Sequence, residues 1–235
     1  MRDFARRKKL SLESAARELR YSFFARVARR TRRNIIFLGH HADDLVETFL
    51  INLFRGSGMT GLSAMREVST RRVGGVKLTI VRPLLTVWRE DIDDYVRRHR
   101  LKFREDATNR DLAPLRNRIR KKLIPYLEKT IGRNIRRNIW RAGTILAEEE
   151  NFFETLLPKT FDPLTNLPVA RLRQTDIAVQ RRIIHSWLQR SSVPDIGFDL
   201  VERIRSLLDT TRQIAKTNLP RDRHVRRRSG KLFIE

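Results

Sequence analysis

The sequence contains no cysteine among its 235 residues. Disulfide bonds and thiolate metal sites are therefore excluded, and the composition fits a reducing cytoplasm, where we expect the protein to be located. No apolar run approaches the roughly 20 residues that a membrane-spanning helix requires, so we expect no membrane partner. The basic opening MRDFARRKKL lacks the apolar segment of a secretory signal peptide.

Glycine is also absent ahead of residue 39, because the first glycine of the sequence is Gly39. Loops that hold phosphate through backbone amides use glycine because the backbone must approach the anion closely. We therefore expect no phosphate-binding loop ahead of Gly39.

Acidic residues are scarce relative to basic ones, with 27 Asp and Glu against 51 Lys and Arg, a formal net charge of +24. Because phosphate contacts dominate the affinity of proteins for nucleic acid, this balance favours a polyanionic partner. A merely solubilising surface is the alternative, although charges of both signs would serve that purpose.

The hydrophobic pattern predicts an α/β domain with parallel strands, followed by a smaller, mainly helical α+β domain. We place the boundary between residues 128 and 129, and a proline-punctuated linker at 157–169. The predicted helices span 11–30, 41–55, 87–100, 116–129, 131–157, 176–190 and 198–208. The predicted strands span 34–39, 76–85, 213–219 and 231–235.

Local signals also predict helix ends and buried faces. We expect Thr86 to cap the helix over 87–100 and Gly56 to end the helix over 41–55. In the latter helix, Leu45, Phe49 and Phe54 are predicted to face inward.

The junction between the apolar run NIIFLG and the next helix carries the most distinctive polar residues: His40, His41, Asp43, Asp44 and Glu47. Ligands bind at the carboxyl ends of strands in open α/β sheets, and Asp44 and Glu47, three residues apart, share a helix face. The two carboxylates could hold an ammonium group or a metal ion. Acids in a first helical turn are also favoured by the helix dipole alone.

Two arginine clusters are candidates for phosphate contact. Arg116, Arg118 and Arg120 lie in RNRIR, where a solvated helix face is the alternative. The second cluster lies near the C-terminus, where a cationic strand edge is the alternative; it comprises Arg221, Arg223, Arg226, Arg227 and Arg228. Arg55, at the end of a predicted helix, could meet phosphate or complement the helix dipole.

Three blocks in fixed order resemble the tRNA(Ile)-lysidine synthase family of PP-loop ATP pyrophosphatases. They are GHHADDLVETFLINLFRGSGMTGLSAM, RPLL and REDATNRDLAPLRNRIRKKLIPYLE. The tail NLPRDRHVRRRSGKLFIE is similar to the end of the family's first C-terminal, tRNA-contacting domain. The resemblance thus covers essentially the whole chain, and it implies an adenine nucleotide alpha hydrolase-like sheet domain followed by a tRNA-binding domain.

The resemblance implies a reaction on the wobble cytidine of tRNA(Ile) with a CAU anticodon. ATP, accompanied by Mg²⁺, activates the C2 oxygen, and the ε-amine of L-lysine then attacks C2 to form lysidine. It implies that Asp44 and Glu47 bind lysine, and that Asp44 and Arg118 are catalytic. Gly39, His40, His41 and Asp43 would form the nucleotide crevice, and no resident metal is expected.

The family also has a Ser-Gly-Gly-x-Asp-Ser phosphate loop near its N-terminus, which this sequence does not contain. We therefore expect the chain to lack the N-terminal PP-loop segment. A fragment of a longer enzyme, one half of a split enzyme and a degenerate relative that only binds tRNA are three explanations. As protein partners we expect either a second copy of the chain in a homodimer or a missing N-terminal partner segment, the latter of which would fit the second explanation.

Two other functions remain open from the sequence. A non-catalytic RNA-binding protein would account for the net charge without any chemistry. A metal phosphohydrolase would use His40, His41, Asp43 and Asp44 as ligands, although adjacent side chains diverge and rarely bind one ion together.

Overall fold

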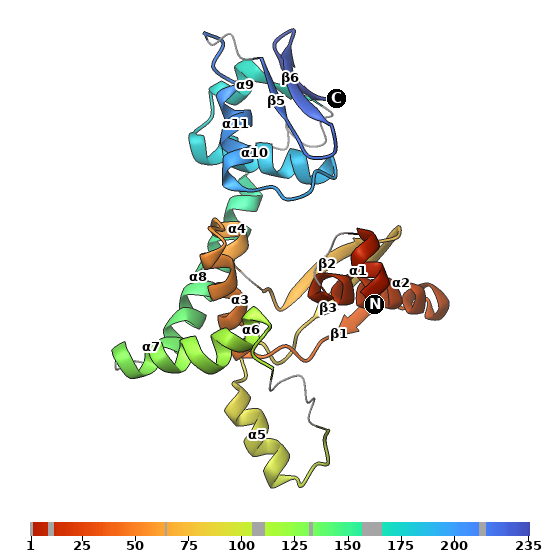
Figure 1. Ribbon diagram of the computed structural model, residues 1–235, viewed down its shortest axis with the longest axis vertical. Helices are drawn as coiled ribbons and strands as arrows, with labels where there is room; N and C mark the ends of the chain where they lie inside the picture. The colour runs from red at the N-terminus through yellow and green to blue at the C-terminus, as the bar shows by residue number, and fades with distance from the viewer. Residues whose placement is uncertain are drawn as a thin grey trace. The chain divides into compact units, whose positions relative to one another are not determined.

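The computed structural model describes residues 2–8, 12–63, 65–104, 111–131, 134–156, 166–211 and 215–235. The chain divides into two compact units (Figure 1). The first contains residues 1–55 and 59–147, and the second contains residues 56–58 and 148–235. Among the described residues, no helix is both long and apolar enough to cross a membrane.

A small mixed sheet lies in the first unit, with strand order β1-β3-β2. β1 (Ile35–Phe37) pairs in parallel with β3 (Val76–Val81), as predicted for these two apolar runs. β2 (Val68–Val73) pairs antiparallel with β3 and was not predicted, because its sequence VSTRRV is largely polar. Gly74 and Gly75, both at positive φ, close the β2–β3 hairpin.

Helix α2 (Leu12–Thr31) covers one face of this sheet, which confirms the helix predicted over 11–30. The cluster between them consists of Tyr21, Ala25, Ala28, Leu78 and Ile80. Small alanine side chains let the helix approach the sheet closely. The parallel pair β1 and β3 thus has a covered face and presents its carboxyl ends to the segments that follow.

Helix α3 (Ala42–Phe54) follows β1, as predicted. Leu45 and Phe49 are buried as expected, but the prediction for Phe54 is wrong, since its side chain is 60% exposed. Phe54 is the last residue of the helix, beyond the part that is packed against neighbours. Gly56 follows at φ +71, in the left-handed conformation that ends many helices.

The predicted helix over 116–129 is interrupted by a π-helical turn. It consists of α6 (Leu115–Arg118), the π-helical turn η2 (Ile119–Leu123) and α7 (Ile124–Ile131). Pro125 gives the physical reason, because proline has no amide hydrogen and its ring clashes with the carbonyl four residues before it. A local widening of the helix relieves both problems.

Helix α5 (Arg89–Arg98) begins later than predicted, and Thr86 is not its cap. The N-cap is Trp88, whose amide donates to the Asp91 side chain at 3.3 Å. The first unit also contains two further short helices and most of a long one: α1 (Arg2–Lys8), α4 (Met59–Leu62) and α8 (Ile135–Leu156), the last of which continues into the second unit.

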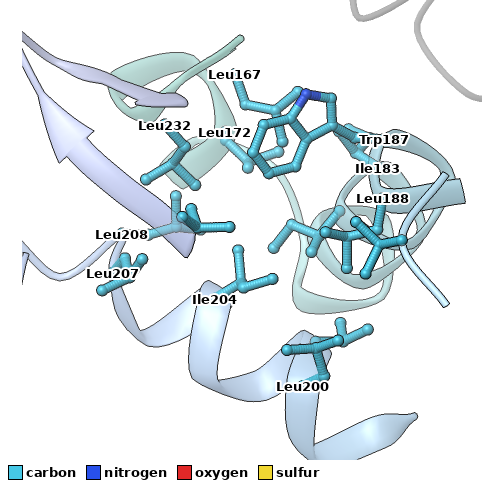
Figure 2. Close-up of a cluster of buried hydrophobic side chains, with 14 of the residues drawn as sticks. Leu167, Leu172, Ile183, Trp187, Leu188, Leu200, Ile204, Leu207, Leu208 and Leu232 are labelled. Atoms are coloured by element: carbon cyan, nitrogen blue, oxygen red, sulfur yellow. The ribbon is translucent and has the colours of Figure 1, made fainter. Parts of the chain in front are cut away.

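Packed leucines and isoleucines around Trp187 form the core of the second unit, as Figure 2 shows. Fully buried members from three helices and one strand include Leu172, Ile184, Ile204 and Leu232. The helices are α9 (Val169–Arg173), α10 (Ile177–Arg190) and α11 (Phe198–Ser206), of which the sequence predicted the last two. Most of the predicted linker, 157–169, lies outside the described residues.

A four-stranded antiparallel sheet, in the order β4-β7-β6-β5, completes this unit. The strands are β4 (Leu167–Pro168), β5 (Lys216–Asn218), β6 (His224–Arg228) and β7 (Lys231–Ile234). The α/β class of the chain is thereby confirmed, with helices and sheet in both units. β4 was not predicted, because it is only two residues long, whereas β6 lies in the arginine cluster for which a strand edge is one interpretation of the sequence.

Candidate active site

The start of α3 is fixed to the carboxyl end of the sheet by its backbone. His41 forms a parallel bridge with Leu84, just beyond β3, and the Ala42 amide donates to the Val87 carbonyl at 2.9 Å. The His41 amide donates to the Asp44 Oδ2 atom at 3.0 Å. Asp44 therefore caps the helix with one oxygen while its other oxygen remains available for a partner.

Arg116 joins Asp44 to Glu47. Its Nη2 atom donates to Asp44 Oδ1 at 2.9 Å, and its Nε atom donates to Glu47 Oε2 at 2.6 Å. The i, i+3 spacing on α3 places both carboxylates within reach of one guanidinium, as the planar fork of arginine requires. The structure thus brings together three residues that the sequence analysis singled out.

Arg120 completes this group. It donates from Nε to Glu47 Oε1 at 2.5 Å and from Nη2 to Glu47 Oε2 at 3.0 Å. Glu47 is fully buried, whereas the Asp44 side chain keeps 13% of its surface exposed. Burial alone would lower the pKa of the Arg120 guanidinium, but the hydrogen bond and charge of Glu47 outweigh it and raise that pKa. We call Asp44, Glu47, Arg116 and Arg120 the carboxylate–arginine network.

Apolar packing beneath the network holds it together. Ile119 and Ile124 pack against Val46 and Leu50 of α3 in one buried cluster. Arg116 and Arg120, one helical turn apart, lie on the side that faces α3. Arg118 lies between them in sequence; it is exposed and has no ion-pair partner in the part of the chain that the structure describes.

Asp43 is connected differently from Asp44. Its Oδ2 atom accepts a hydrogen bond from the Arg89 amide at 2.9 Å, and its Oδ1 atom accepts one from Arg136 Nη1 at 3.1 Å. Arg136 also donates to Glu128 at 3.0 Å. Asp43 therefore joins α3 to the first residue of α5 and to α8, and its predicted place in a nucleotide crevice stays a prediction.

The two histidines lie beside this network. His40 Nδ1 and His41 Nδ1 are buried without a hydrogen-bond partner among the described residues. Desolvation lowers the pKa of His40, and the charges of Arg82 and Arg116 lower it further, against the opposing effect of Asp44. A neutral imidazole with an unpaired nitrogen can accept a hydrogen bond from a ligand, which fits the predicted nucleotide side of the site.

Arg82 and Arg136 were not predicted as site residues. Arg82, in the RPLL block, is buried, and its Nη1 atom donates to the Arg66 carbonyl at 2.8 Å and to Ser69 Oγ at 3.0 Å. Its Nε atom is buried without a partner. The RPLL resemblance pointed to Arg82, whereas nothing local could have revealed Arg136, which lies 93 residues from Asp43 in sequence.

The geometry around His41 does not favour the metal-site alternative among the described residues. His41 Nδ1 lies 3.7 Å from Asp43 Oδ2, and His41 Nε2 lies 3.5 Å from Asp44 Oδ2. The described ranges contain no group of three or more histidine, aspartate or glutamate side chains that could hold a metal ion. Both aspartates instead bind arginine.

The C-terminal arginines divide into two sets. Arg223 donates to the Ser191 carbonyl at 2.9 Å, and Arg227 donates to the carbonyls of Leu207 and Asp209, so both serve the structure of the second unit. The remaining three are exposed: Arg221, Arg226 and Arg228. Only Arg226 of these has an ion pair within the described residues, at 3.8 Å from Glu235.

Two predicted residues lie outside these groups. Gly39 is exposed ahead of the histidines, and a Cβ atom there would meet nothing within 4 Å. Arg55 is the exposed C-cap residue of α3, at the opposite end from the network. These contacts do not test the nucleotide-crevice role of Gly39 or the phosphate contact of Arg55, so both roles stay predictions.

Comparison with known families decides how this geometry is to be interpreted. Residues 2–127 match the family described as PP-loop domain. The chain belongs to the PP-loop family. Residues 167–233 of this PP-loop protein match a second family, described as TilS substrate binding domain. The first match includes the whole carboxylate–arginine network, and the second includes the exposed arginines of the C-terminal unit.

Curated relatives of this PP-loop protein are named tRNA(Ile)-lysidine synthase. One from Geobacter sulfurreducens is 34% identical over 91% of the chain and 46% of the relative. One from Synechocystis sp. is 32% identical over 88% of the chain and 66% of the relative. One from Francisella tularensis subsp. holarctica is 32% identical over 77% of the chain and 45% of the relative. The chain thus spans about half to two thirds of the length of these relatives, and the similarity supports the resemblance found in the sequence.

One expectation must be corrected. The absence of a Ser-Gly-Gly-x-Asp-Ser loop predicts that the chain lacks the N-terminal PP-loop segment. The PP-loop domain match begins at residue 2 and extends to residue 127, so the domain is present and that expectation is not supported. The absence of one glycine-rich motif was too narrow a criterion for the absence of the domain.

Proposed function

We propose that this protein modifies tRNA(Ile) by joining lysine to C2 of the wobble cytidine, with ATP as the activating substrate. The domain match over 2–127 supports use of ATP, and the match over 167–233 supports a tRNA substrate. The observation that carries the proposal is the carboxylate–arginine network, in which two acids and two arginines meet at the carboxyl end of a parallel strand pair.

Asp44 is the carboxylate that we assign to the ε-ammonium group of lysine. Its side chain is the more exposed of the two acids, and only Oδ1 binds Arg116 while Oδ2 caps the helix. An incoming ammonium group can take the place of one Arg116 hydrogen bond at Asp44 while Arg116 keeps its bond to Glu47. Glu47 then holds both arginines in place, and its own contact with lysine stays a prediction.

The proposed chemistry has two steps. The C2 oxygen of cytidine attacks the α-phosphorus of ATP, and pyrophosphate leaves. The ε-ammonium group of lysine then gives up a proton to solvent, the resulting amine attacks C2, the C2–O bond breaks, and AMP leaves. Negative charge develops on the α-phosphate in the first step, where a preoriented cation is effective. Arg118 is the candidate for this role because it is exposed near the network without an ion-pair partner among the described residues.

Mg²⁺ belongs to this proposal as the ion that accompanies the ATP phosphates. No set of carboxylates in the described part of the chain is arranged to hold it. The two unpaired imidazole nitrogens fit hydrogen-bond donors of a nucleotide, so His40 and His41 are assigned to that side of the site.

We assign tRNA phosphate contact to one face of the C-terminal sheet. The register pairs Lys216 with Arg226 and Arg228 with Lys231, and directly paired residues lie on the same face. Arg227 points to the opposite face, where the neighbouring Val225 is fully buried and the guanidinium binds carbonyls. The two domains proposed for the three substrates are 1–128 for ATP and lysine and 129–235 for the tRNA body.

Substitutions on the two faces of β6 separate contact from structure. We expect the double variant Arg226→Ala, Arg228→Ala to bind tRNA more weakly and to lower the slope of log affinity against log salt by about 2, because two phosphate contacts are lost. Arg227→Ala is the control; it should lower thermal stability and leave that slope unchanged. Affinities measured over a salt series check both, and an unchanged slope in the double variant would exclude this face.

Transfer of labelled lysine tests the function itself. The chain is incubated with a tRNA(Ile) transcript carrying the CAU anticodon, ATP, Mg²⁺ and labelled lysine. We expect label in the tRNA only when ATP is present. Salt-sensitive tRNA binding without any transfer would instead support the non-catalytic RNA-binding alternative, which the net charge of +24 favours. Repeating the assay after sedimentation shows whether the active species is a monomer or the proposed homodimer.

A further inference from the structure

Aromatic side chains are exposed at the C-terminal end of α5, away from the carboxylate–arginine network. The Tyr95 and His99 rings stack with centroids 4.1 Å apart and an interplanar angle of 24°. His99 Nδ1 lies 3.0 Å from the Tyr95 carbonyl oxygen, which fixes the ring against the helix. Tyr95 is 58% exposed and Phe103, a few residues later, is 62% exposed. Figure 1 shows α5 projecting from the rest of the first unit.

The same segment is strongly basic. Residues 95–104, which we call the α5 platform, read YVRRHRLKFR and contain five Lys and Arg and no acid. Arg97 pairs with Asp94 at 2.6 Å, whereas the other four cations have no ion-pair partner within the described residues; they are Arg98, Arg100, Lys102 and Arg104. The acids of α5 lie before the platform, where Asp91 accepts from the Trp88 amide and Asp93 pairs with Arg89.

The turn that ends α5 contains Arg100 in a backbone conformation that glycine adopts more easily. Arg100 has φ +52, and the following Leu101 amide donates to the Val96 carbonyl at 3.0 Å. Glycine is the usual residue at such a position, because side chains are strained there. Arginine at this point adds another exposed charge between the stacked pair and Phe103.

We propose that the α5 platform binds unpaired nucleotides of RNA by stacking bases on Tyr95 and Phe103. Phosphate contact alone would need only the cations, but two exposed rings among them match single-stranded RNA, whose bases are free to stack. A paired duplex offers no free base faces except at its ends. The proposal extends the proposed function, since the modified cytidine lies in an anticodon loop.

The position of the platform relative to the network fits a single loop. The Arg89 amide, at the first residue of α5, binds Asp43 at the start of α3, so this end of α5 is fixed beside the site. A helix of ten residues is about 15 Å long. The platform is therefore about one short helix away from the network, a distance that neighbouring nucleotides of the same loop can span.

Binding of two RNAs to the full chain tests the proposal. One is a stem-loop that carries the tRNA(Ile) anticodon loop, and the other is a duplex of the same stem without a loop. We expect the double variant Tyr95→Ala, Phe103→Ala to bind the stem-loop about a hundredfold more weakly, because two stacked bases are lost and each contributes about tenfold. Its affinity for the duplex should equal that of the unmodified chain. Binding is measured by fluorescence anisotropy without ATP or lysine.

Two matched variants complete the design. Phe152→Ala removes an aromatic side chain of similar exposure, 60%, that is flanked by glutamates in the sequence EEENFFE, and it should leave both affinities unchanged. Tyr95→Phe, Phe103→Tyr keeps both rings and should retain stem-loop affinity. Equal stem-loop binding by the alanine variant, or an equal loss for stem-loop and duplex, would overturn the proposal. The binding assay contains no lysine. Its result therefore does not depend on whether the chain transfers lysine to tRNA.

Discussion

Replacing Asp44 with asparagine lowers kcat/KM for lysine about a hundredfold, because the variant loses the negative charge that we assign to the ammonium group. Asparagine has nearly the same shape, and its amide oxygen can still accept the hydrogen bond from the His41 amide that begins α3. The substitution therefore removes the charge and preserves the helix cap. The loss should appear mainly in KM for lysine, with KM for ATP less affected.

The control for this prediction is Asp93→Asn. Asp93 lies on α5 and forms an ion pair with Arg89 at 2.9 Å. The Asp93 side chain is 48% exposed. An exposed pair of this kind contributes little, so the control should transfer lysine at the unmodified rate. The kinetics are measured with saturating tRNA and ATP while lysine is varied. Equal kcat/KM for Asp44→Asn and Asp93→Asn would remove Asp44 from the lysine site.

Replacing Glu47 with glutamine lowers the free energy of unfolding by about 3 kcal/mol, because it removes a buried carboxylate from its ion pairs and leaves Asp44 to balance the charges of Arg116 and Arg120. Glu47 is fully buried and accepts three hydrogen bonds, from Arg116 and Arg120. Glutamine keeps one acceptor oxygen, but its NH₂ group would face a guanidinium, where donor meets donor. Urea denaturation of the full chain at neutral pH measures this difference.

Glu202→Gln is the matched control because Glu202 also binds two arginines. Arg181 donates to it at 2.7 Å and Arg205 at 2.8 Å, and these hydrogen bonds lower the pKa of Glu202 to about 2. Glu202 is ionised in both folded and unfolded chains at neutral pH, but its side chain is partly exposed on the surface of the second unit. We expect a loss below about 1 kcal/mol. Equal losses for the two variants would show that burial of Glu47 does not matter.

The sequence predicted the acidic junction well, because the relevant signals are local. An apolar run followed by Ala42–Phe54 with helical periodicity fixes the strand, the helix and the common face of Asp44 and Glu47. The arginine cluster RNRIR supplied Arg116 as a candidate for phosphate contact, and the structure places it against both acids. Local sequence could not show that these carboxylates bind arginine in the folded chain, because Glu47 and Arg120 lie 73 residues apart.

Charge patterns were the weaker guide. Five arginines near the C-terminus were treated as one cluster, but strand alternation sends Arg226 and Arg228 to one face and Arg227 to the other. A strand edge was one interpretation of this cluster, but the pairing partners of β6 could not be predicted, because strand pairing depends on residues that are distant in sequence. The cap at Thr86 was wrong for a related reason, since Asp43, far away in sequence, binds the Arg89 amide and helps set where α5 begins.

Calorimetric titration of L-lysine into the full chain tests the account most directly, because it measures the contact assigned to Asp44 without any chemistry. The titration is performed with the unmodified chain, Asp44→Asn and Asp93→Asn, each in the presence of tRNA and a nonhydrolysable ATP analogue. We predict saturable lysine binding to the unmodified chain and to Asp93→Asn, and none in the same concentration range to Asp44→Asn. Lysine binding of equal affinity to all three chains would contradict the account.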